Sequence, residues 1–500
     1  MRRVIFLFIF SLPVWAKDIG VNKIFAPTGI IAPGFITPRV QIKNFASEEE
    51  SLFVYFSIFL TNGEKVYYES SFAKVNGNAT QNVSFSPWNA TLGSYIPRCS
   101  TALLDDVNPV NDTLSEKVLV LAITPGQWIS RESMPPGPDK KRVKDGGAMV
   151  DGSKGRDKFI YALKGNNTRE FYCYDAILNQ WFLRREVPID PLNPKNVKKG
   201  GSLTKEGDYI YLIKGNKTFE FWAYDINGDS WIRRKDVPSG PEGKALKGGS
   251  FITRGKIENK NYIFLIKGGT KEFYAYDIGE DTWISRREIP YTERPTKIKD
   301  GSCLVYDGGG HLYLLKGGYN ELFFYDCNSD TWSPKKPMPL FGSTMRKRKV
   351  KNGAAMVYER GQDVIYALKG GGTNEFWAYF VEGDSWHELA SVPLGEKGKK
   401  VKGGGSLSLT AGQVFALKGG GSNELWMYTP PAFLIFSGIN SSGIPQRKNS
   451  IKVASFGKFK ADEKVFFYDA LGRFMPQKKG QKGIYFLKRG DNFIKVVVIK

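Results

Sequence analysis

Four residue patterns, each repeated six times between residues 126 and 430, constrain the fold of this chain most strongly. The first is a tryptophan followed seven residues later by proline: Trp128, Trp181, Trp231, Trp283, Trp332 and Trp386. The second is a lysine between Leu or Ile and Gly: Lys164, Lys214, Lys267, Lys316, Lys369 and Lys418. The third is a glutamate before Phe or Leu: Glu170, Glu220, Glu272, Glu321, Glu375 and Glu424. The fourth is Lys-x-Gly: Lys144, Lys198, Lys247, Lys299, Lys351 and Lys402. Consecutive tryptophans lie 49 to 54 residues apart, so the region is a repeat array.

One period contains four short β-like segments and no window with a sustained helical pattern. In the fifth repeat these segments are residues 353–358, 364–368, 375–379 and 385–392, separated by glycine-rich turns. Four strands in about 50 residues describe one blade of a β-propeller. Arginine pairs on the fourth segments, such as Arg233-Arg234, fit edge protection there.

Three features of each period resemble the kelch family: the glycine pair after the second strand, the Tyr in the third, and the Trp that opens the fourth. The resemblance implies a six-bladed kelch-like β-propeller over residues 124–430, with the six tryptophans as blade anchors. A lysine precedes each glycine pair, and in the first two repeats Asn166 and Asn216 replace its second glycine. This departure indicates a basic subfamily.

The numbers of strands also predict how the ring closes. The sixth repeat, which contains Lys418, lacks a Trp-Pro segment, whereas a surplus one stands before the first repeat at residues 128–135. We expect this segment to be the outermost strand of the last blade, because that pairing covers two otherwise open sheet edges.

The N-terminal region has two parts. Residues 1–16 combine Arg2 and Arg3 with an apolar run and small residues at the end, which is typical of a secretory signal peptide. Residues 17–123 lack the repeat and contain alternating strand-like runs, which indicate a β-sandwich. Segments such as 36–45 and 87–95 resemble bacterial immunoglobulin-like adhesion modules, so the resemblance implies an immunoglobulin-like domain.

The C-terminal region follows a linker at residues 431–448 that is rich in Pro, Gly, Ser and Asn. Residues 449–500, with the segments 468–473 and 483–487 and a terminal lysine, resemble the sorting module of type IX secretion substrates. The resemblance implies an export address read by the export machinery. A small β cap on the propeller is the alternative.

Residues for catalysis are scarce. The two histidines, His311 and His387, occupy different blade positions, and no phosphate-binding loop, nucleophile elbow or dinucleotide fingerprint occurs. Four cysteines in 500 residues do not form a disulfide framework. We therefore expect no catalytic site, metal, disulfide or cofactor. A kelch-type sugar-isomerising or other carbohydrate-active enzyme, or a purely structural surface protein, is the alternative.

The formal net charge of +22 directs attention to the lysines. Both lysine series and the glutamates fall near one end of each blade, because adjacent antiparallel strands return there. We expect the second-strand lysines and the glutamates to form a structural belt between blades. The Lys-x-Gly lysines are then candidates to bind an acidic glycan, another polyanion or an extracellular protein. Export argues against nucleic acid, and it places the protein outside a bacterium or on its outer surface.

Overall fold

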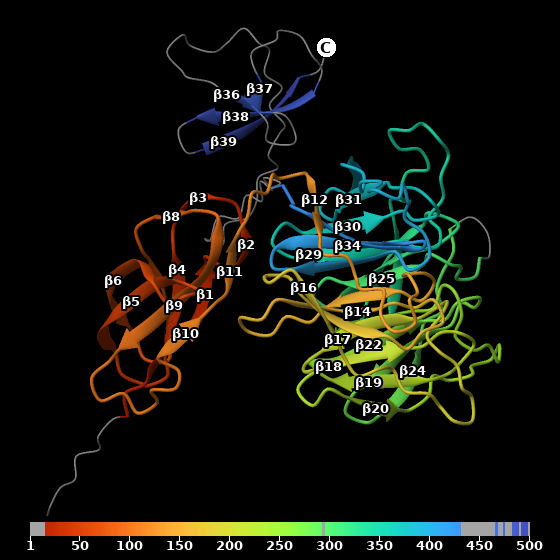
Figure 1. The fold of residues 1–500 in the computed structure, drawn as a ribbon, viewed down its shortest axis with the longest axis horizontal. Helices are drawn as coiled ribbons and strands as arrows, with labels where there is room; N and C mark the ends of the chain where they lie inside the picture. Colours follow the sequence, from red (N-terminus) through yellow and green to blue (C-terminus); the bar gives the residue numbers. More distant parts are fainter. Residues whose placement is uncertain are drawn as a thin grey trace, which may run out of the picture.

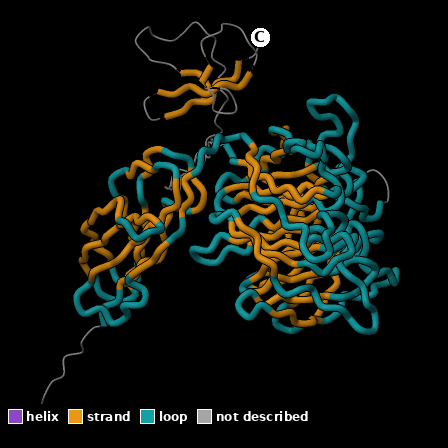
Figure 2. Tube along the Cα trace, in the orientation of Figure 1, coloured by secondary structure: helices purple, strands orange, loops and turns teal. Residues whose placement is uncertain are grey.

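The computed structural model describes residues 16–292 and 296–431, and the backbone of four strands between residues 466 and 498. Every regular element in these ranges is a β-strand (Figure 2), which confirms the all-β fold class. Within the same ranges no helix has the length and apolar character needed to cross a membrane. The predicted signal peptide, up to residue 15, and the predicted linker, from residue 432, lie outside the described residues.

Six four-stranded antiparallel sheets form the propeller (Figure 1). Blade 1 is β13 (Ala148–Asp151), β14 (Phe159–Leu163), β15 (Phe171–Asp175) and β16 (Gln180–Leu183). Blade 2 is β17 (Ser202–Glu206), β18 (Tyr209–Ile213), β19 (Phe221–Asp225) and β20 (Ser230–Arg234). Blade 3 is β21 (Phe251–Ile257), β22 (Lys260–Ile266), β23 (Phe273–Asp277) and β24 (Thr282–Arg286). Blade 4 is β25 (Cys303–Tyr306), β26 (His311–Leu315), β27 (Leu322–Asp326) and β28 (Thr331–Lys335). Blade 5 is β29 (Ala355–Glu359), β30 (Val364–Leu368), β31 (Phe376–Phe380) and β32 (Ser385–Leu389).

Blade 6 closes the ring with strands from both ends of the repeat region. It contains β33 (Ser406–Thr410), β34 (Gln413–Gly419) and β35 (Ser422–Tyr428), and its outermost strand is β12 (Trp128–Arg131). Trp128 pairs with Tyr428 and Arg131 with Leu425. The predicted closure is therefore confirmed. The first strands of the six blades contact one another in sequence around the central axis, with β13 against β33.

The anchor tryptophans join each blade to the one before it. The indole Nε1 of every anchor donates a hydrogen bond to a backbone carbonyl at the end of the preceding blade's fourth strand, at 2.7 to 3.1 Å. Trp128 donates to Ala390 O and thereby links blade 6 to blade 5. The ring of Trp128 also packs edge-on against Phe376, at 4.9 Å between centroids. The repeated tryptophan is thus an inter-blade contact as well as a core residue.

The two ends of the propeller are formed by different connections between the strands. Each first strand begins at a Lys-x-Gly loop and ends at the hairpin turn to the second strand, and we call these two ends the lysine face and the hairpin face. On the lysine face, six backbone N–H groups donate to carbonyls of the apolar residues that precede the Lys-x-Gly lysines of the next blade, from Asn167 N to Val197 O round to Gly421 N to Val143 O. These bonds fix the loops that present the lysines.

The N-terminal region forms two facing sheets around one apolar core. The first has the order β1 (Ile19–Ala26), β4 (Arg39–Asn44), β7 (Thr80–Ser84). The second has the order β2 (Gly29–Ile31), β11 (Val118–Val120), β9 (Gly93–Ala102), β5 (Glu50–Leu60), β6 (Lys65–Val75), with β10 (Thr113–Ser115) paired to β9. A separate pair joins β3 (Gly34–Ile36) to β8 (Trp88–Ala90).

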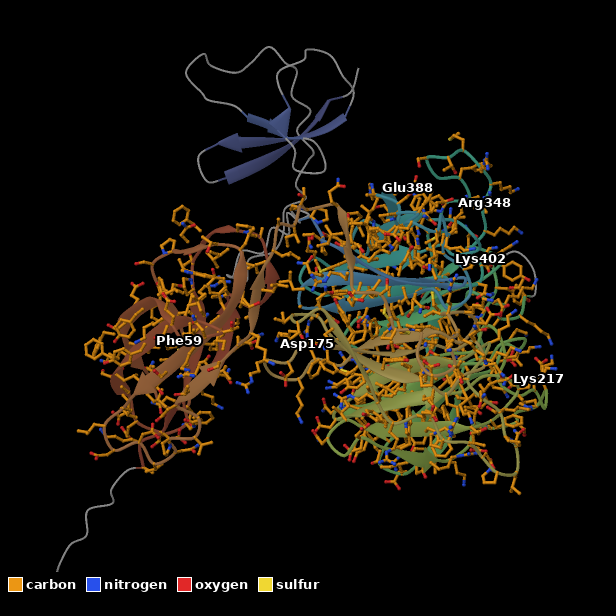
Figure 3. The ribbon with its side chains drawn as sticks, in the orientation of Figure 1. Phe59, Asp175, Lys217, Arg348, Glu388 and Lys402 are labelled. Atoms are coloured by element: carbon orange, nitrogen blue, oxygen red, sulfur yellow. The ribbon has the colours of Figure 1, made fainter. Side chains whose placement is uncertain are left out.

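This sandwich lies against the hairpin face of the propeller. Ile30 N donates to Ala411 O in the turn between β33 and β34, at 3.2 Å. Lys117 forms an ion pair with Asp157, in the turn between β13 and β14, at 2.8 Å. Figure 3 accordingly shows Asp175 on the side of the propeller that faces the sandwich, and Lys217 and Lys402 on the opposite side. The sandwich therefore leaves the lysine face uncovered.

The C-terminal region contributes a sheet of order β37 (Phe474–Met475), β36 (Phe466–Tyr468), β38 (Gly483–Arg489), β39 (Asn492–Val498). The remaining residues of the predicted sorting module lie outside the described residues. Its proposed role as an export address therefore stays a prediction.

Candidate functional site

The second-strand lysines lie inside the propeller wall. All six side chains have no solvent exposure, and each forms an ion pair with the glutamate six residues later, or five later in blades 3 and 4. Lys267 illustrates the geometry: its Nζ lies 2.7 Å from Glu272 and donates to the carbonyl oxygens of Pro238 and Ser239 at 2.9 and 2.7 Å. These carbonyls belong to the loop that leads from β20 of blade 2 to Lys247 and the first strand of blade 3. Lys164, Lys214, Lys316 and Lys418 donate to carbonyl oxygens of the equivalent loops, so each of these pairs ties its blade to the loop that leads into it.

The glutamates of this belt have a second donor in their own blade. The residue two positions later donates from its ring, as Tyr172 OH does to Glu170 at 2.6 Å and Trp222 Nε1 to Glu220 at 3.0 Å. In blade 4 this residue is Phe323, which has no donor, and the Thr292 hydroxyl donates to Glu321 instead, at 2.6 Å. Burial lowers the pKa of Lys316 in this blade, against the opposing effect of Glu321. Removing one member of such a buried ion pair would leave the other charge buried without a counter-charge and would destabilise the fold.

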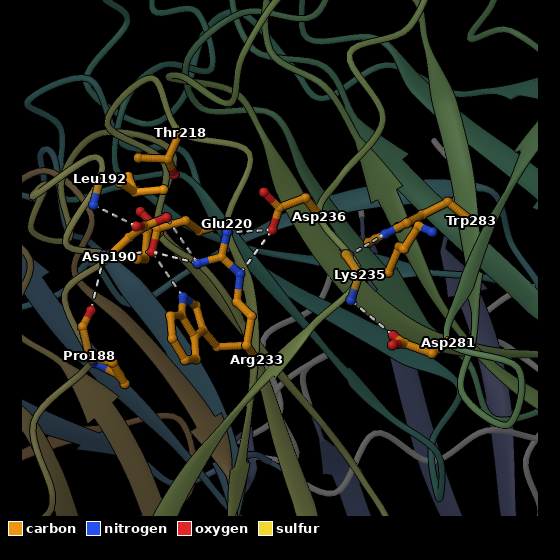
Figure 4. Close-up of polar contacts among 12 residues, drawn as sticks. Pro188, Asp190, Leu192, Thr218, Glu220, Arg233, Lys235, Asp236, Asp281 and Trp283 are labelled. Carbon is orange, nitrogen blue, oxygen red and sulfur yellow. Dashed lines mark hydrogen bonds and ion pairs between the residues drawn. The ribbon is translucent and has the colours of Figure 1, made fainter.

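Blade 2 adds a second cation to its belt glutamate (Figure 4). Arg233, on the outermost strand β20, lies 3.5 Å from both Glu220 and Asp190 and pairs with Asp236 at 2.6 Å. Its guanidinium also lies over the Trp222 ring, 5.0 Å from the centroid. Arg233 therefore forms a specific ion cluster in addition to any protection of the sheet edge.

The Lys-x-Gly lysines have the opposite environment. All six are exposed, whereas the apolar residue immediately before each of them is buried. Among the described residues none of these six lysines has an ion-pair partner, although Lys299 Nζ lies 4.8 Å from the centre of the Tyr319 ring. The alternation of a buried anchor and an exposed lysine holds the ammonium groups on the lysine face.

The residues after these lysines form two bridges near the axis. Lys199 of blade 2 forms an ion pair with Asp300 of blade 4, and Asn352 of blade 5 donates to Asp145 of blade 1 at 2.8 Å. Blade 3, between blades 2 and 4, has Gly248 at the equivalent position, and blade 6, between blades 5 and 1, has Gly403. A Cβ at Gly248 would overlap the Asp300 carboxylate, and one at Gly403 would overlap the Asp145 carboxylate. The hydrogen bond with Asp300 is the main cause that raises the pKa of Lys199. The two bridges therefore link the Lys-x-Gly loops of blades 2 and 4 and of blades 5 and 1.

A cavity of about 970 Å³ opens on the lysine face beside these bridges. Its lining includes seven lysines and one carboxylate: Lys199, Lys217, Lys247, Lys297, Lys299, Lys349, Lys351 and Asp300. Asp300 is paired with Lys199, and Lys297 pairs with Glu242 at 2.6 Å. The other five lysines have no ion-pair partner in the described part of the chain. Such a surplus of cations makes the cavity a potential anion site.

The structure thus brings three of the six candidate lysines, Lys247, Lys299 and Lys351, into one cavity, whereas Lys144, Lys198 and Lys402 lie outside its lining. The sequence interpretation missed four lysines of the lining: Lys199, Lys217, Lys297 and Lys349. The last two stand two residues before a candidate lysine, with a buried apolar residue between. This alternation of Lys, apolar residue and Lys was the available signal. Lys217 occupies a turn position at which the other repeats have no lysine, so no repeated pattern in the sequence pointed to it.

The cysteine thiols are isolated from solvent. The four cysteines are buried and unpaired, and burial raises the pKa of Cys173 to about 11. Within residues 16–292 and 296–431 no group of three or more His, Cys, Asp or Glu residues has the arrangement of a metal site. A second cavity, of about 360 Å³, lies along the axis between the six first strands.

Fold and site together define a closed six-bladed β-propeller with one basic face. No family model and no curated protein matches the chain. Similar solved structures include an auxiliary nutrient binding protein from Bacteroides thetaiotaomicron, with 10% identity over 82% of this chain and 97% of that one, at a TM-score of 0.41. A regucalcin from Agrobacterium tumefaciens has 12% identity over 61% of this chain and 97% of its own, at a TM-score of 0.39. At these levels neither likeness carries a function.

A third similar structure corrects one sequence prediction. It is a luciferin-regenerating enzyme, with 10% identity over 61% of this chain and 95% of that one, at a TM-score of 0.40. An enzyme is therefore found among the similar structures, although the likeness is distant. The prediction that this chain is not an enzyme, made from the lack of recognisable motifs, is withdrawn.

Proposed function

We propose that this chain is an exported surface protein whose lysine face binds an acidic glycan or a comparable polyanion. The observation that carries the proposal is the cavity lined by seven lysines, of which five have no ion pair among the described residues. Exposed like charges held on fixed loops repel one another, and a bound anion relieves this repulsion. The sandwich supports the proposal by its position, because it contacts the opposite face.

The resemblances complete the proposed organisation. The kelch-like repeat supplies the propeller, the immunoglobulin-like sandwich is a spacer or adhesive unit, and the C-terminal region is an export address. Together they describe a protein that presents its basic face outside the cell.

A binding titration with a sulfated oligosaccharide tests the function. We expect the affinity to fall markedly between about 0.05 M and about 0.3 M salt, because salt screens exposed charges. The double substitution Lys299→Met and Lys351→Met should weaken binding about tenfold, because each exposed ionic contact contributes about 0.7 kcal/mol. Methionine keeps most of the aliphatic stem, so the unfolding midpoint should stay unchanged.

The matched control replaces two exposed cations of the hairpin face, Lys256→Met and Arg360→Met, with the same loss of charge. Its affinity should stay within about twofold of the parent protein. Equal weakening by both double substitutions would mean that only net charge matters, and salt-independent binding would contradict the proposal.

A further inference from the structure

The lysine face has sixfold repeated loops, but its charge is not distributed with sixfold symmetry. We propose that the ligand is a linear polyanion that lies along the arc of blades 2 to 5, and not a compact anion held at the axis. This inference rests on the function proposed above and adds the class and placement of the ligand.

The first reason is the distribution of the lysines without ion pairs. The cavity takes them from four consecutive blades: Lys217 from blade 2, Lys247 from blade 3, Lys299 from blade 4, and Lys349 and Lys351 from blade 5. They lie in four loops or turns, one in each blade, because Lys349 and Lys351 share a loop, and the five are exposed. Ammonium groups spread over successive loops match a chain of separated anionic groups better than a single small anion.

The second reason is the arrangement near the axis. The bridges from Lys199 to Asp300 and from Asn352 to Asp145 occupy the space where the six loops meet. Asp300 forms an ion pair with Lys199, whereas Asp145 accepts a hydrogen bond from the amide of Asn352 and forms no ion pair among the described residues. An anionic chain therefore passes beside the axis, on the side away from the Asp145 carboxylate.

The repeat supplies the test, because chemically equivalent lysines can be removed inside the lining of the cavity and outside it. The arc variant carries Lys247→Met, Lys299→Met and Lys351→Met, and the control variant carries Lys144→Met, Lys198→Met and Lys402→Met. Both lose three charges from the same position of the repeat. The full-length protein and both variants are titrated with inorganic sulfate and with sulfated di-, tetra-, hexa- and octasaccharides at low salt, and their melting temperatures are compared.

We expect the affinity of the parent protein to rise at least about tenfold from the disaccharide to the octasaccharide, because each added anionic group meets another loop. The arc variant should bind the octasaccharide about 30-fold more weakly and lose most of the length dependence, whereas the control variant should change by less than about threefold. The dependence of affinity on salt should also decrease most in the arc variant.

Three results would overturn the proposal while leaving anion binding intact: equal effects of the two variants, a larger effect of the control variant, or affinity that does not depend on chain length. Failure of the parent protein to bind any sulfated saccharide at low salt would instead remove the proposed function itself. An arc variant with a markedly lower melting temperature is replaced by the single substitution Lys299→Met, which should still weaken octasaccharide binding more than Lys198→Met.

Discussion

At the scale of single residues, two lysines in the same repeat have opposite roles. Lys369 ends a second strand and is buried against Glu375, whereas Lys351 precedes the first strand of the same blade and is exposed. The difference follows from the neighbours. Lys369 continues a strand whose side chains are all buried, and Lys351 follows the buried Val350 in a loop.

The buried pairs predict a strong effect on stability. Replacing Glu272 by Ala leaves the Lys267 ammonium buried with only carbonyl partners, so we expect a loss of about 3 kcal/mol in the free energy of unfolding, measured with urea. The double substitution Lys267→Met and Glu272→Leu should restore much of it. Glu288 is the control in the same blade, because its pair with Lys271 is exposed; Glu288→Ala should cost less than about 0.5 kcal/mol. Similar losses for both glutamates would contradict the structural role of the belt.

At the scale of elements, the turn before each fourth strand connects neighbouring blades. In blades 1 to 5 its last residue has a positive φ and is Asn179, Asp229, Asp281, Asp330 or Asp384, residue types that tolerate this conformation. Asp281 accepts a hydrogen bond from Tyr276 OH at 2.5 Å. It also accepts one from Lys235 N of the preceding blade at 2.9 Å (Figure 4). Before Trp128 the same conformation is provided by Gly126.

These turns predict loss of stability in acid. For Asp229, Asp281 and Asp384, burial opposes ionisation as the largest single effect, but the tyrosine and backbone hydrogen bonds outweigh it and lower the pKa of each carboxyl. A lowered pKa in the folded state stabilises the fold above the unfolded value of about 4, and this contribution is lost as the pH falls through the folded pKa. The urea midpoint should therefore drop between about pH 5 and about pH 3. Asp281→Asn should reduce this drop, and an unchanged pH profile in that variant would contradict the assignment.

At the scale of the whole molecule, the ring depends on a strand from before the first repeat. β12 covers the edge of β35, and the Trp128 indole bonds to the preceding blade, so blade 6 is complete only with both ends of the region present. An open edge in blade 6 would expose unpaired backbone groups and apolar surface.

Two truncated chains test this dependence. A chain that begins at residue 124 keeps β12 without the sandwich and should unfold cooperatively. A chain that begins at residue 137 lacks β12 and should lose cooperative unfolding or become insoluble, as followed by thermal melting and light scattering. Equal melting of the two chains would show that β12 is dispensable for closure.

The sequence by itself determined the all-β class, the number of blades and the strand that closes the ring. The period, the positions of Trp128 and Lys418 and the missing sixth Trp-Pro segment are sufficient for these, because strand pairing within a blade is local in the chain. It also placed both lysine series at one end of the blades.

Only the tertiary structure decided which lysines face solvent together. The bridges from Lys199 to Asp300 and from Asn352 to Asp145 join residues about 100 and about 200 positions apart, across an intervening blade whose glycine leaves the space. The cavity draws its lysines from four blades, and Lys217 belongs to it although no repeated pattern marks that position. Contacts across a closed ring depend on where six separate sheets meet, and no pattern within a single repeat contains that information.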